Sequence, residues 1–453
     1  MDRSDHFERA LANRLARLEY DELPEAAVRA AERSITDTVG VAVAGLETEV
    51  GERARTFVGV EDDSVRGFDG LAPGTYDSPF DAALAIGAAI HALDYDDTTH
   101  AIRGHPSATL VPALCALSDT PGVDGEDVLT AYVAGFEAAA AIARPIVTDH
   151  YKRGWHATAT FGVFGSAVAA AVLRGATADE LETTLTVAAS TAAGVKENFG
   201  SMMKPIQVGL AARSGLTAAE LALVGVTADS TAISGEQGFW ALYGGEVEHD
   251  PAVDRWHLVE DRIYLKKYPC CRATQTSLDA TLALVDEYDL EPDDVRSVDV
   301  FGSKNAAQIL KHPNPQTGLE AKFSLPYTVA HALADGDVGL SAFDDERVGD
   351  PALETLRERV TFHVDPDLPY NSQDATVRIR TDDGEFERTV TDSYGRSGGG
   401  HDLAVDDDRL RAKFLECTRS VVDEAAALAV FDRLEDLRTV DSFGFVVDRR
   451  SMR

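Results

Sequence analysis

The sequence predicts a mainly α-helical protein: a large all-helical domain with a smaller α+β domain inserted before the C-terminal helices. Long Ala-rich segments fill the first half, apolar and polar residues alternate after about residue 261, and a helical pattern returns near the C-terminus. A chain of 453 residues is long enough for two or three domains. The expected divisions are a helical domain over residues 1–264, the α+β domain over 265–400, and helices over 401–453 that rejoin the first domain.

The helical domain is predicted from segments that have almost no polar face. Residues 23–45 place apolar side chains at helical spacing and end on a glycine, which commonly terminates a helix. Three later segments, residues 128–143, 158–173 and 181–193, are small and apolar on nearly every side. Helices without a polar face are buried. The sequence therefore predicts a compact bundle with several central helices.

The α+β domain is predicted from short alternating runs. Residues 295–301 and 360–364 each alternate like a strand, and residues 375–390 read as two strands joined at an Asp-Gly pair, a strong hairpin signal. Residues 326–334 are expected to be helical.

The C-terminal part follows a predicted flexible boundary at residues 397–400, SGGG. Residues 406–422 and 423–437 return to a helical pattern. We therefore expect the α+β domain to be an insertion in the chain.

The charge of the chain is strongly acidic and evenly spread. The formal net charge is −35 at pH 7, and only nine of the 42 basic residues are lysine. Dispersed acid with little lysine suggests a surface adapted to high salt, where screening weakens self-repulsion. Binding to nucleic acid is not expected, because it needs a basic surface.

Other features favour a soluble, cytoplasmic protein with reduced thiols. No apolar run is long enough to span a membrane, and the N-terminus lacks the apolar core of a signal peptide. The four cysteines form no CxxC pair, so a zinc ribbon or a cysteine-held iron–sulfur cluster is not expected. They are Cys115, Cys270, Cys271 and Cys417.

A dense polar segment, HALDYDDTTHAIRGHPS, lies between two apolar runs. Both runs are predicted helices, and loops braced by helices often carry functional sites. Asp96 and Asp97 are interpreted as solvated or helix-capping acids of an acidic loop. Asp94, Arg103 and His105 fit that interpretation less well and are candidate site residues.

Basic residues gather in three further segments. Five of the nine lysines lie at predicted element ends, within residues 196–215, 265–275 and 322–327. On an acidic chain this grouping predicts a basic pocket for a small polyanion, where arginine and lysine bind carboxylates. His156, at the mouth of an apolar helix, is either a structural histidine or a proton carrier. The five lysines are Lys196, Lys204, Lys266, Lys267 and Lys322.

Several segments occur in an order that resembles the MmgE/PrpD family, which includes 2-methylcitrate dehydratase, cis-aconitate decarboxylase and iminodisuccinate epimerase. They are HALDYDDTTH, HPSATLVPAL, GWHATATFG, MKPIQVGLAARSG, GEQGFW, KKYPCC and AKFSLPYTVAHAL. The resemblance spans nearly the whole chain. It implies a large helical domain, a smaller α+β lid, a homodimer, and no metal or organic cofactor. It also implies a substrate site formed by Asp94, Thr98, His105, His156, Lys204 and Tyr327.

The residues and the resemblance together favour a hydro-lyase acting on a small di- or tricarboxylate. The first hypothesis is dehydration of 2-methylcitrate to 2-methyl-cis-aconitate. Lys204, with Arg103 or Arg272, would neutralise the carboxylate beside the proton that is removed. Either His105 or His156 would be the base, and the other would protonate the leaving hydroxyl.

The remaining candidates have supporting roles. Asp94 would orient a histidine or bind a substrate hydroxyl, and Tyr327 would close the site from the lid. Many family members carry a histidine where this chain has Gln275, a change that removes one possible proton carrier. The candidate substrate-binding residues are Thr98, Arg103, Lys266, Lys267, Arg272 and Gln275.

Other functions remain open at this stage. Decarboxylation of cis-aconitate or epimerisation of an imino-dicarboxylate would use the same pocket. A class II terpene cyclase shares a DxDDT-like acid motif, but an aromatic content of 7% is low for a cavity that stabilises carbocations. A metal site at His91, Asp94, Asp97, His100 and His105 lacks a paired spacing on one helix. The last alternative is a binding protein without catalytic activity.

Overall fold

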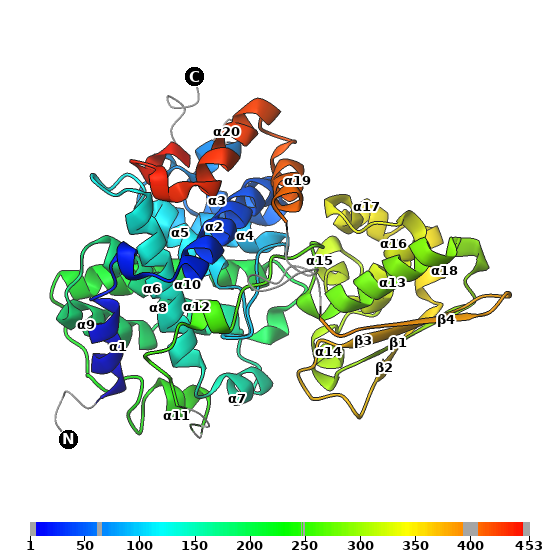
Figure 1. Ribbon diagram of the computed structural model, residues 1–453, viewed down its shortest axis with the longest axis horizontal. Helices are drawn as coiled ribbons and strands as arrows, with labels where there is room; N and C mark the ends of the chain where they lie inside the picture. The colour runs from blue at the N-terminus through cyan, green and yellow to red at the C-terminus, as the bar shows by residue number, and fades with distance from the viewer. Residues whose placement is uncertain (1–5, 61–65, 246, 248–249, 393–405, 447–453) are drawn as a thin grey trace.

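The computed structural model describes residues 6–60, 66–245, 247, 250–392 and 406–446. Two bodies lie side by side (Figure 1): a large helical one and a smaller one that combines helices with a sheet. The predicted fold class is therefore confirmed. The predicted SGGG boundary at residues 397–400, and with it the division at residue 400, lies outside the described residues.

Six helices form the centre of the helical body, as the apolar segments predicted. In α8 every residue except Val172 is buried. The helices α4 and α10 approach so closely that a Cβ atom on Gly209 would lie 2.2 Å from the carbonyl oxygen of Leu84, so this contact requires glycine. The six are α2 (Glu25–Leu46), α4 (Pro79–Ala92), α5 (Ser107–Ala116), α6 (Gly125–Ala143), α8 (Ala157–Leu173) and α10 (Met203–Leu223).

Outer helices cover this centre. The C-terminal helices α19 (Asp407–Thr418) and α20 (Glu424–Glu435) rejoin the helical body, as expected, and bury Leu410 and Phe414 in its core. None of the helices in the described ranges combines the length and apolar character needed to cross a bilayer. The other outer helices are α1 (Phe7–Leu15), α3 (Glu49–Phe57), α7 (Val147–Lys152), α9 (Ala178–Ala189), α11 (Phe239–Tyr243) and α12 (His257–Glu260).

The smaller body, residues 275–392, is called the lid below. Its sheet has the order β2-β1-β3-β4. Strand β1 (Ser297–Gly302) is parallel to β2 (Val360–Val364) and antiparallel to β3 (Ala375–Arg380). The predicted hairpin is confirmed, because β3 pairs antiparallel with β4 (Glu385–Val390) across the turn that contains the Asp-Gly pair. The parallel pair was not predicted, since it depends on a long crossover connection.

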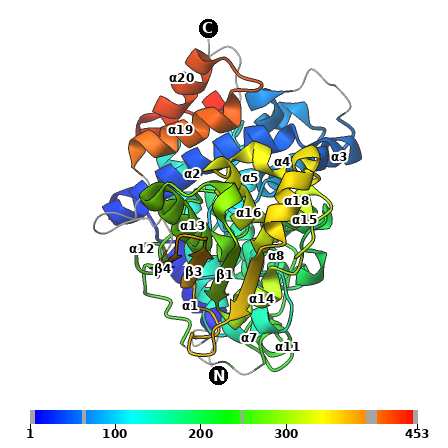
Figure 2. The ribbon, with the colours of Figure 1, turned by 90° about the vertical axis from the view of Figure 1, so that its right-hand side faces the viewer.

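Helices cover one face of the lid sheet (Figure 2), and Val298, Val300, Val377 and Ile379 are fully buried. This gives the lid its own apolar core, separate from that of the helical body. The lid helices are α13 (Gln275–Tyr288), α14 (Lys304–Ile309), α15 (Gly318–Ala321), α16 (Leu325–Asp335), α17 (Asp345–Val348) and α18 (Pro351–Arg357).

Candidate active site

A pocket lies between the helical body and the lid, and it brings together residues that are far apart in the sequence. The helical body contributes the loop after α4, the start of α8 and the first turn of α10. The lid and the connecting segment (residues 264–274) supply the opposite wall. Seven of the sequence-predicted site residues line this pocket: Asp94, Thr98, Arg103, His105, His156, Lys204 and Arg272.

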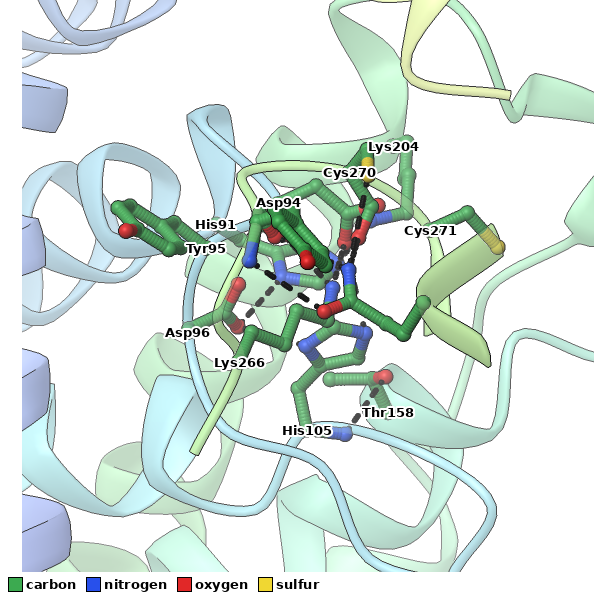
Figure 3. Close-up of polar contacts among 12 residues, drawn as sticks. His91, Asp94, Tyr95, Asp96, His105, Thr158, Lys204, Lys266, Cys270 and Cys271 are labelled. Atoms are coloured by element: carbon green, nitrogen blue, oxygen red, sulfur yellow. Dashed lines mark hydrogen bonds and ion pairs between the residues drawn. The ribbon is translucent and has the colours of Figure 1, made fainter. Parts of the chain in front are cut away.

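Asp94 is held by two lysines (Figure 3). Its Oδ1 atom lies 3.1 Å from Nζ of Lys204 and 2.9 Å from Nζ of Lys266, which also donates to the Asp94 carbonyl at 2.7 Å. Burial alone would raise the pKa of Asp94, but these two ammonium groups hold it well below its ordinary value. Asp94 also has a φ of 52°, in the left-handed region that such residues adopt only when their surroundings hold them there.

Asp96 lies between two histidines. Nδ1 of His91 is 2.8 Å from its Oδ2 atom, and Nδ1 of His105 is 3.0 Å from the same oxygen. The two hydrogen bonds of His91 place its proton on Nδ1 and leave its Nε2 as an acceptor. Nδ1 of His105 lies close to Asp96 but makes no hydrogen bond among the described residues. Nε2 of His91 accepts from Lys204 at 2.6 Å. Nε2 of His105 remains available to a ligand, with Asp94 3.6 Å away.

Both imidazoles are neutral at neutral pH. Burial lowers the pKa of His105 to about 3, although Asp96 opposes this shift. The pKa of His91 is lowered for the same reason. The backbone N–H of His105 donates to Thr158 at 3.2 Å. The preceding Gly104 approaches α8 so closely that a Cβ atom there would lie 2.8 Å from the Thr158 nitrogen, so the loop needs a glycine to seat His105.

The interpretation of Asp96 and Asp97 as solvated acids is wrong. Both are fully buried, because the loop folds under the pocket rather than into solvent. The capping part of the interpretation holds for Asp97, whose carboxylate accepts the N–H of Ser107 at the start of α5. Burial raises the pKa of the Asp97 carboxyl group to about 8.

His156 occupies the N-cap position of α8, where its backbone N–H donates to Gly194 at 3.0 Å. Its ring stacks 5.7 Å from that of His91 and meets Phe199 edge-on at 5.0 Å, measured between ring centres. Burial lowers the pKa of His156 well below its ordinary value. Its Nδ1 atom is buried and has no hydrogen-bond partner within the described part of the chain.

The two arginines of the pocket differ in their contacts. The guanidinium of Arg272 lies 3.8 Å from the ring centre of Tyr264, and its Nη1 and Nη2 atoms have no hydrogen-bond partner among the described residues. Nη2 of Arg272 also lies 3.7 Å from the Asp392 carboxylate. Arg103 instead donates to Asn371 of the lid, and so ties the polar loop to the opposite wall.

Four candidate residues are not among those that line the pocket: Lys266, which contacts it only through Asp94, and Tyr327, Lys267 and Gln275. The Tyr327 hydroxyl donates to the carbonyl of Ala342 inside the lid. Lys267 pairs with Asp279 at 3.1 Å, on the outer side of the connecting segment. Gln275 is buried and donates to the carbonyl of Tyr268 at 3.1 Å, so it braces the connecting segment.

Sequence reasoning missed several residues at the site. His91 was considered only as a metal ligand, although a single histidine at the end of an apolar helix was a usable signal. Asn305, Asn371 and Gln373 reach the pocket from lid segments whose sequence carries no comparable signal.

Asp96 and three neighbouring side chains also have donor atoms that suit a transition metal. One ligand atom from each of His91, Asp94, Asp96 and His105 lies within 4.8 Å of the others. However, two ammonium groups already lie against Oδ1 of Asp94, and their positive charge would repel a cation. The residues present therefore fit a lysine-held carboxylate better than a metal ion.

The fold and the pocket define a class of protein: a mainly α-helical protein with a smaller α+β lid, and with imidazoles and cations around a pocket between the two. Family models give this class a name. The MmgE/PrpD N-terminal domain matches residues 9–252 and the MmgE/PrpD C-terminal domain matches residues 268–437. The chain belongs to the MmgE/PrpD family, as the motifs indicated.

Relatives of known activity align over most of the chain. A cis-aconitate decarboxylase from Mus musculus is 27% identical over 442 residues, which cover 93% of this chain and 89% of the relative. One from Homo sapiens is 28% identical and covers 83% of this chain and 81% of the relative. One from Aspergillus terreus is 26% identical and covers 79% and 80%.

Proposed function

We propose that the protein is a lyase that decarboxylates a small unsaturated tricarboxylate, with cis-aconitate as the first candidate. The relatives with the name cis-aconitate decarboxylase support this over dehydration of 2-methylcitrate, the first hypothesis from the sequence.

The observation that carries the proposal is a group of buried polar atoms without partners around one pocket. Buried polar groups are normally hydrogen-bonded, so such a group points to a missing polar ligand. Two of the atoms are nitrogens of one guanidinium, whose delocalised positive charge suits carboxylate oxygens. Among the described residues that line the pocket, the atoms are Asp94 Oδ2, Thr98 Oγ1, His105 Nδ1, His156 Nδ1, Arg272 Nη1 and Nη2, and Asn305 Oδ1.

The pocket provides what the reaction needs. The bond from the methylene carbon to its carboxylate breaks, CO₂ leaves, the double bond shifts, and the far alkene carbon takes up a proton. Negative charge develops next to a remaining carboxylate, where Lys204 or Arg272 stabilises it. The bound trianion raises the pKa of His105 and His156, so a proton enters with the substrate and is available for the carbon.

Dehydration of 2-methylcitrate is the second candidate, and one observation favours it. Burial favours the neutral form of His105 by lowering its pKa to about 3, and Asp96 lies 3.0 Å from Nδ1, an arrangement that suits a general base. Epimerisation of a dicarboxylate would use the same base. The homodimer implied by the family remains a prediction, which light scattering tests.

The deciding experiment offers cis-aconitate and 2-methylcitrate separately to the protein in high-salt buffer and identifies products by NMR. Release of CO₂ with an unsaturated dicarboxylate from cis-aconitate supports the proposal. Formation of an unsaturated tricarboxylate from 2-methylcitrate would instead support dehydration as the function. Turnover of neither acid by the folded protein overturns the tricarboxylate proposal and leaves epimerisation as the remaining candidate.

A further inference from the structure

We propose that Lys413, on the C-terminal helix α19, is a positioning residue that holds Asp94 and Lys266 in their reactive arrangement. The inference rests on the proposed function only in so far as it concerns turnover. Lys413 does not line the pocket, and none of the sequence motifs includes it.

The ammonium group of Lys413 makes three contacts beneath the pocket. It donates to the carbonyl oxygens of Tyr95 at 2.8 Å and Lys266 at 3.1 Å, and it lies 2.7 Å from Oδ1 of Asp37 on α2. Two of these contacts are hydrogen bonds to backbone carbonyls, and the third is an ion pair with a buried carboxylate. The side chain is 9% exposed and the Asp37 carboxylate is fully buried. The contacts are therefore shielded from water and from salt.

The two carbonyls belong to the two segments that build the Asp94 cluster. Tyr95 follows Asp94 directly, and Lys266 is one of the two lysines on its carboxylate. Lys266 is thus held at both ends, by Asp94 at Nζ and by Lys413 at its carbonyl. Asp94, Lys266, Lys413 and Tyr95 form a closed ring of contacts.

This ring explains how Asp94 keeps a left-handed backbone. A residue with φ of 52° keeps it only when several contacts fix the adjoining peptides. Four residues after Asp94, Thr98 and Tyr264 each donate a backbone N–H to the other's carbonyl, at 2.9 and 2.8 Å. The loop and the connecting segment are therefore tied at two points, and Lys413 is the tie next to Asp94. The C-terminal helices thus support the site as well as the core.

The test compares Lys413→Met with Arg438→Met. Methionine keeps the length of Lys413 but removes its donors. Arg438 offers a matched control because it also links the C-terminal segment to α2, through Glu32 at 2.8 Å, and is not among the residues that line the pocket. We expect kcat on cis-aconitate to fall roughly 100-fold in Lys413→Met, the usual order for a displaced catalytic group. Arg438→Met loses stability but keeps kcat near that of the parent.

A second readout does not depend on turnover. The amides of Thr98 and Tyr264 should exchange hydrogen faster in Lys413→Met, with no change at these amides in Arg438→Met. If Lys413→Met exchanges faster but neither the parent nor any variant turns over cis-aconitate, the positioning role is supported. The proposed function is then wrong. Parent-like kcat together with parent-like exchange in Lys413→Met would overturn the positioning role.

Removing Lys413 alone leaves the buried carboxylate of Asp37 without its cation, which can unfold the chain. The double variant Asp37→Leu, Lys413→Met removes both charges and should fold. It should show the same loss of kcat and the same faster exchange. If its kcat equals that of the parent, the carbonyl contacts of Lys413 have no positioning role.

Discussion

Nζ of Lys204 donates to Nε2 of His91 across 2.6 Å. The lysine thereby links the carboxylate of Asp94 with that of Asp96, which His91 contacts. The same ammonium lies 3.1 Å from Asp94, while Nδ1 of His91 contacts Asp96. A hydrogen-bonded path therefore runs from Lys204 through His91 to Asp96, and Nδ1 of His105 lies 3.0 Å from the same Asp96 oxygen. A proton change at one end of this path is felt at the other.

Replacement of His91 by leucine should break this path without touching the pocket wall. We expect kcat to fall by about 100-fold, the lower end for loss of acid–base assistance, and the pH profile to change shape because Lys204 and Asp96 each lose a partner. His150→Leu is the matched control, since His150 is equally buried but bonds Thr160 outside the site. An unchanged pH profile for His91→Leu would show that the path carries no proton.

Binding of a trianion should be accompanied by proton uptake. His105 and His156 are neutral in the free protein, and three negative charges nearby raise the pKa of each ring. Calorimetry with the unreactive tricarballylate at pH 7, in two buffers of different ionisation enthalpy, measures the protons taken up. We expect net uptake by the parent and less by His105→Asn. Equal heats in both buffers would mean that the histidines stay neutral in the complex.

The helices of this fold were predictable because their apolar patterns are local. Residues 158–173 were expected to be a buried helix, and α8 is one. The β3–β4 hairpin also follows from a local turn signal. The parallel pairing of β1 with β2 was not predictable, because 57 residues separate Gly302 from Val360 and no local pattern fixes that partner.

Residue types at the site were predicted better than their contacts. Asp94, His105 and Lys204 do meet in one pocket. The burial of Asp96 could not be read from the sequence, because an acid in an acidic chain is usually solvated. Tyr327 was placed at the substrate by resemblance, but its hydroxyl is bound inside the lid. Such pairings are decided by backbone positions that only the complete fold defines.

Gln275 should prove structural in this chain. Its amide accepts from the N–H of Tyr268 at 3.3 Å and donates to the Tyr268 and Cys270 carbonyls at 3.1 and 3.3 Å, next to Arg272. A histidine cannot make all three contacts, so Gln275→His should lower the free energy of unfolding by about 1–3 kcal/mol and weaken binding of the tricarboxylate. Urea unfolding and a KM measurement check this, with Gln373→His as a control on the pocket wall. Higher activity in Gln275→His would instead mean that a histidine at this position acts as a proton carrier.

Stability should fall as the solution is acidified below pH 6.5. Burial lowers the pKa of His105 and His150 to about 3, while unfolded histidine titrates near 6.5. Between these values the unfolded chain binds protons that the folded chain does not, so each such histidine costs about 1.4 kcal/mol per pH unit. Urea unfolding at several pH values between 7.5 and 5 measures the slope, which His150→Gln should reduce. Asp97, whose pKa is raised to about 8, holds a proton in the folded chain over the same range and offsets one histidine. A slope that His150→Gln leaves unchanged would mean that His150 titrates alike in the folded and unfolded chain.

The net charge of −35 predicts that salt stabilises the fold. Raising KCl from about 0.1 M to about 1 M shortens the screening length from about 10 Å to about 3 Å, which weakens repulsion between surface carboxylates. Buried pairs such as Asp94 with Lys266, whose side chains are 3% and 0% exposed, are screened much less. The urea midpoint should therefore rise with KCl while the site remains intact, and sucrose of equal osmolarity separates screening from solute exclusion. A midpoint that is flat or falls with KCl would remove the high-salt explanation of the acidic surface, and the charge would then need a basic partner to explain it.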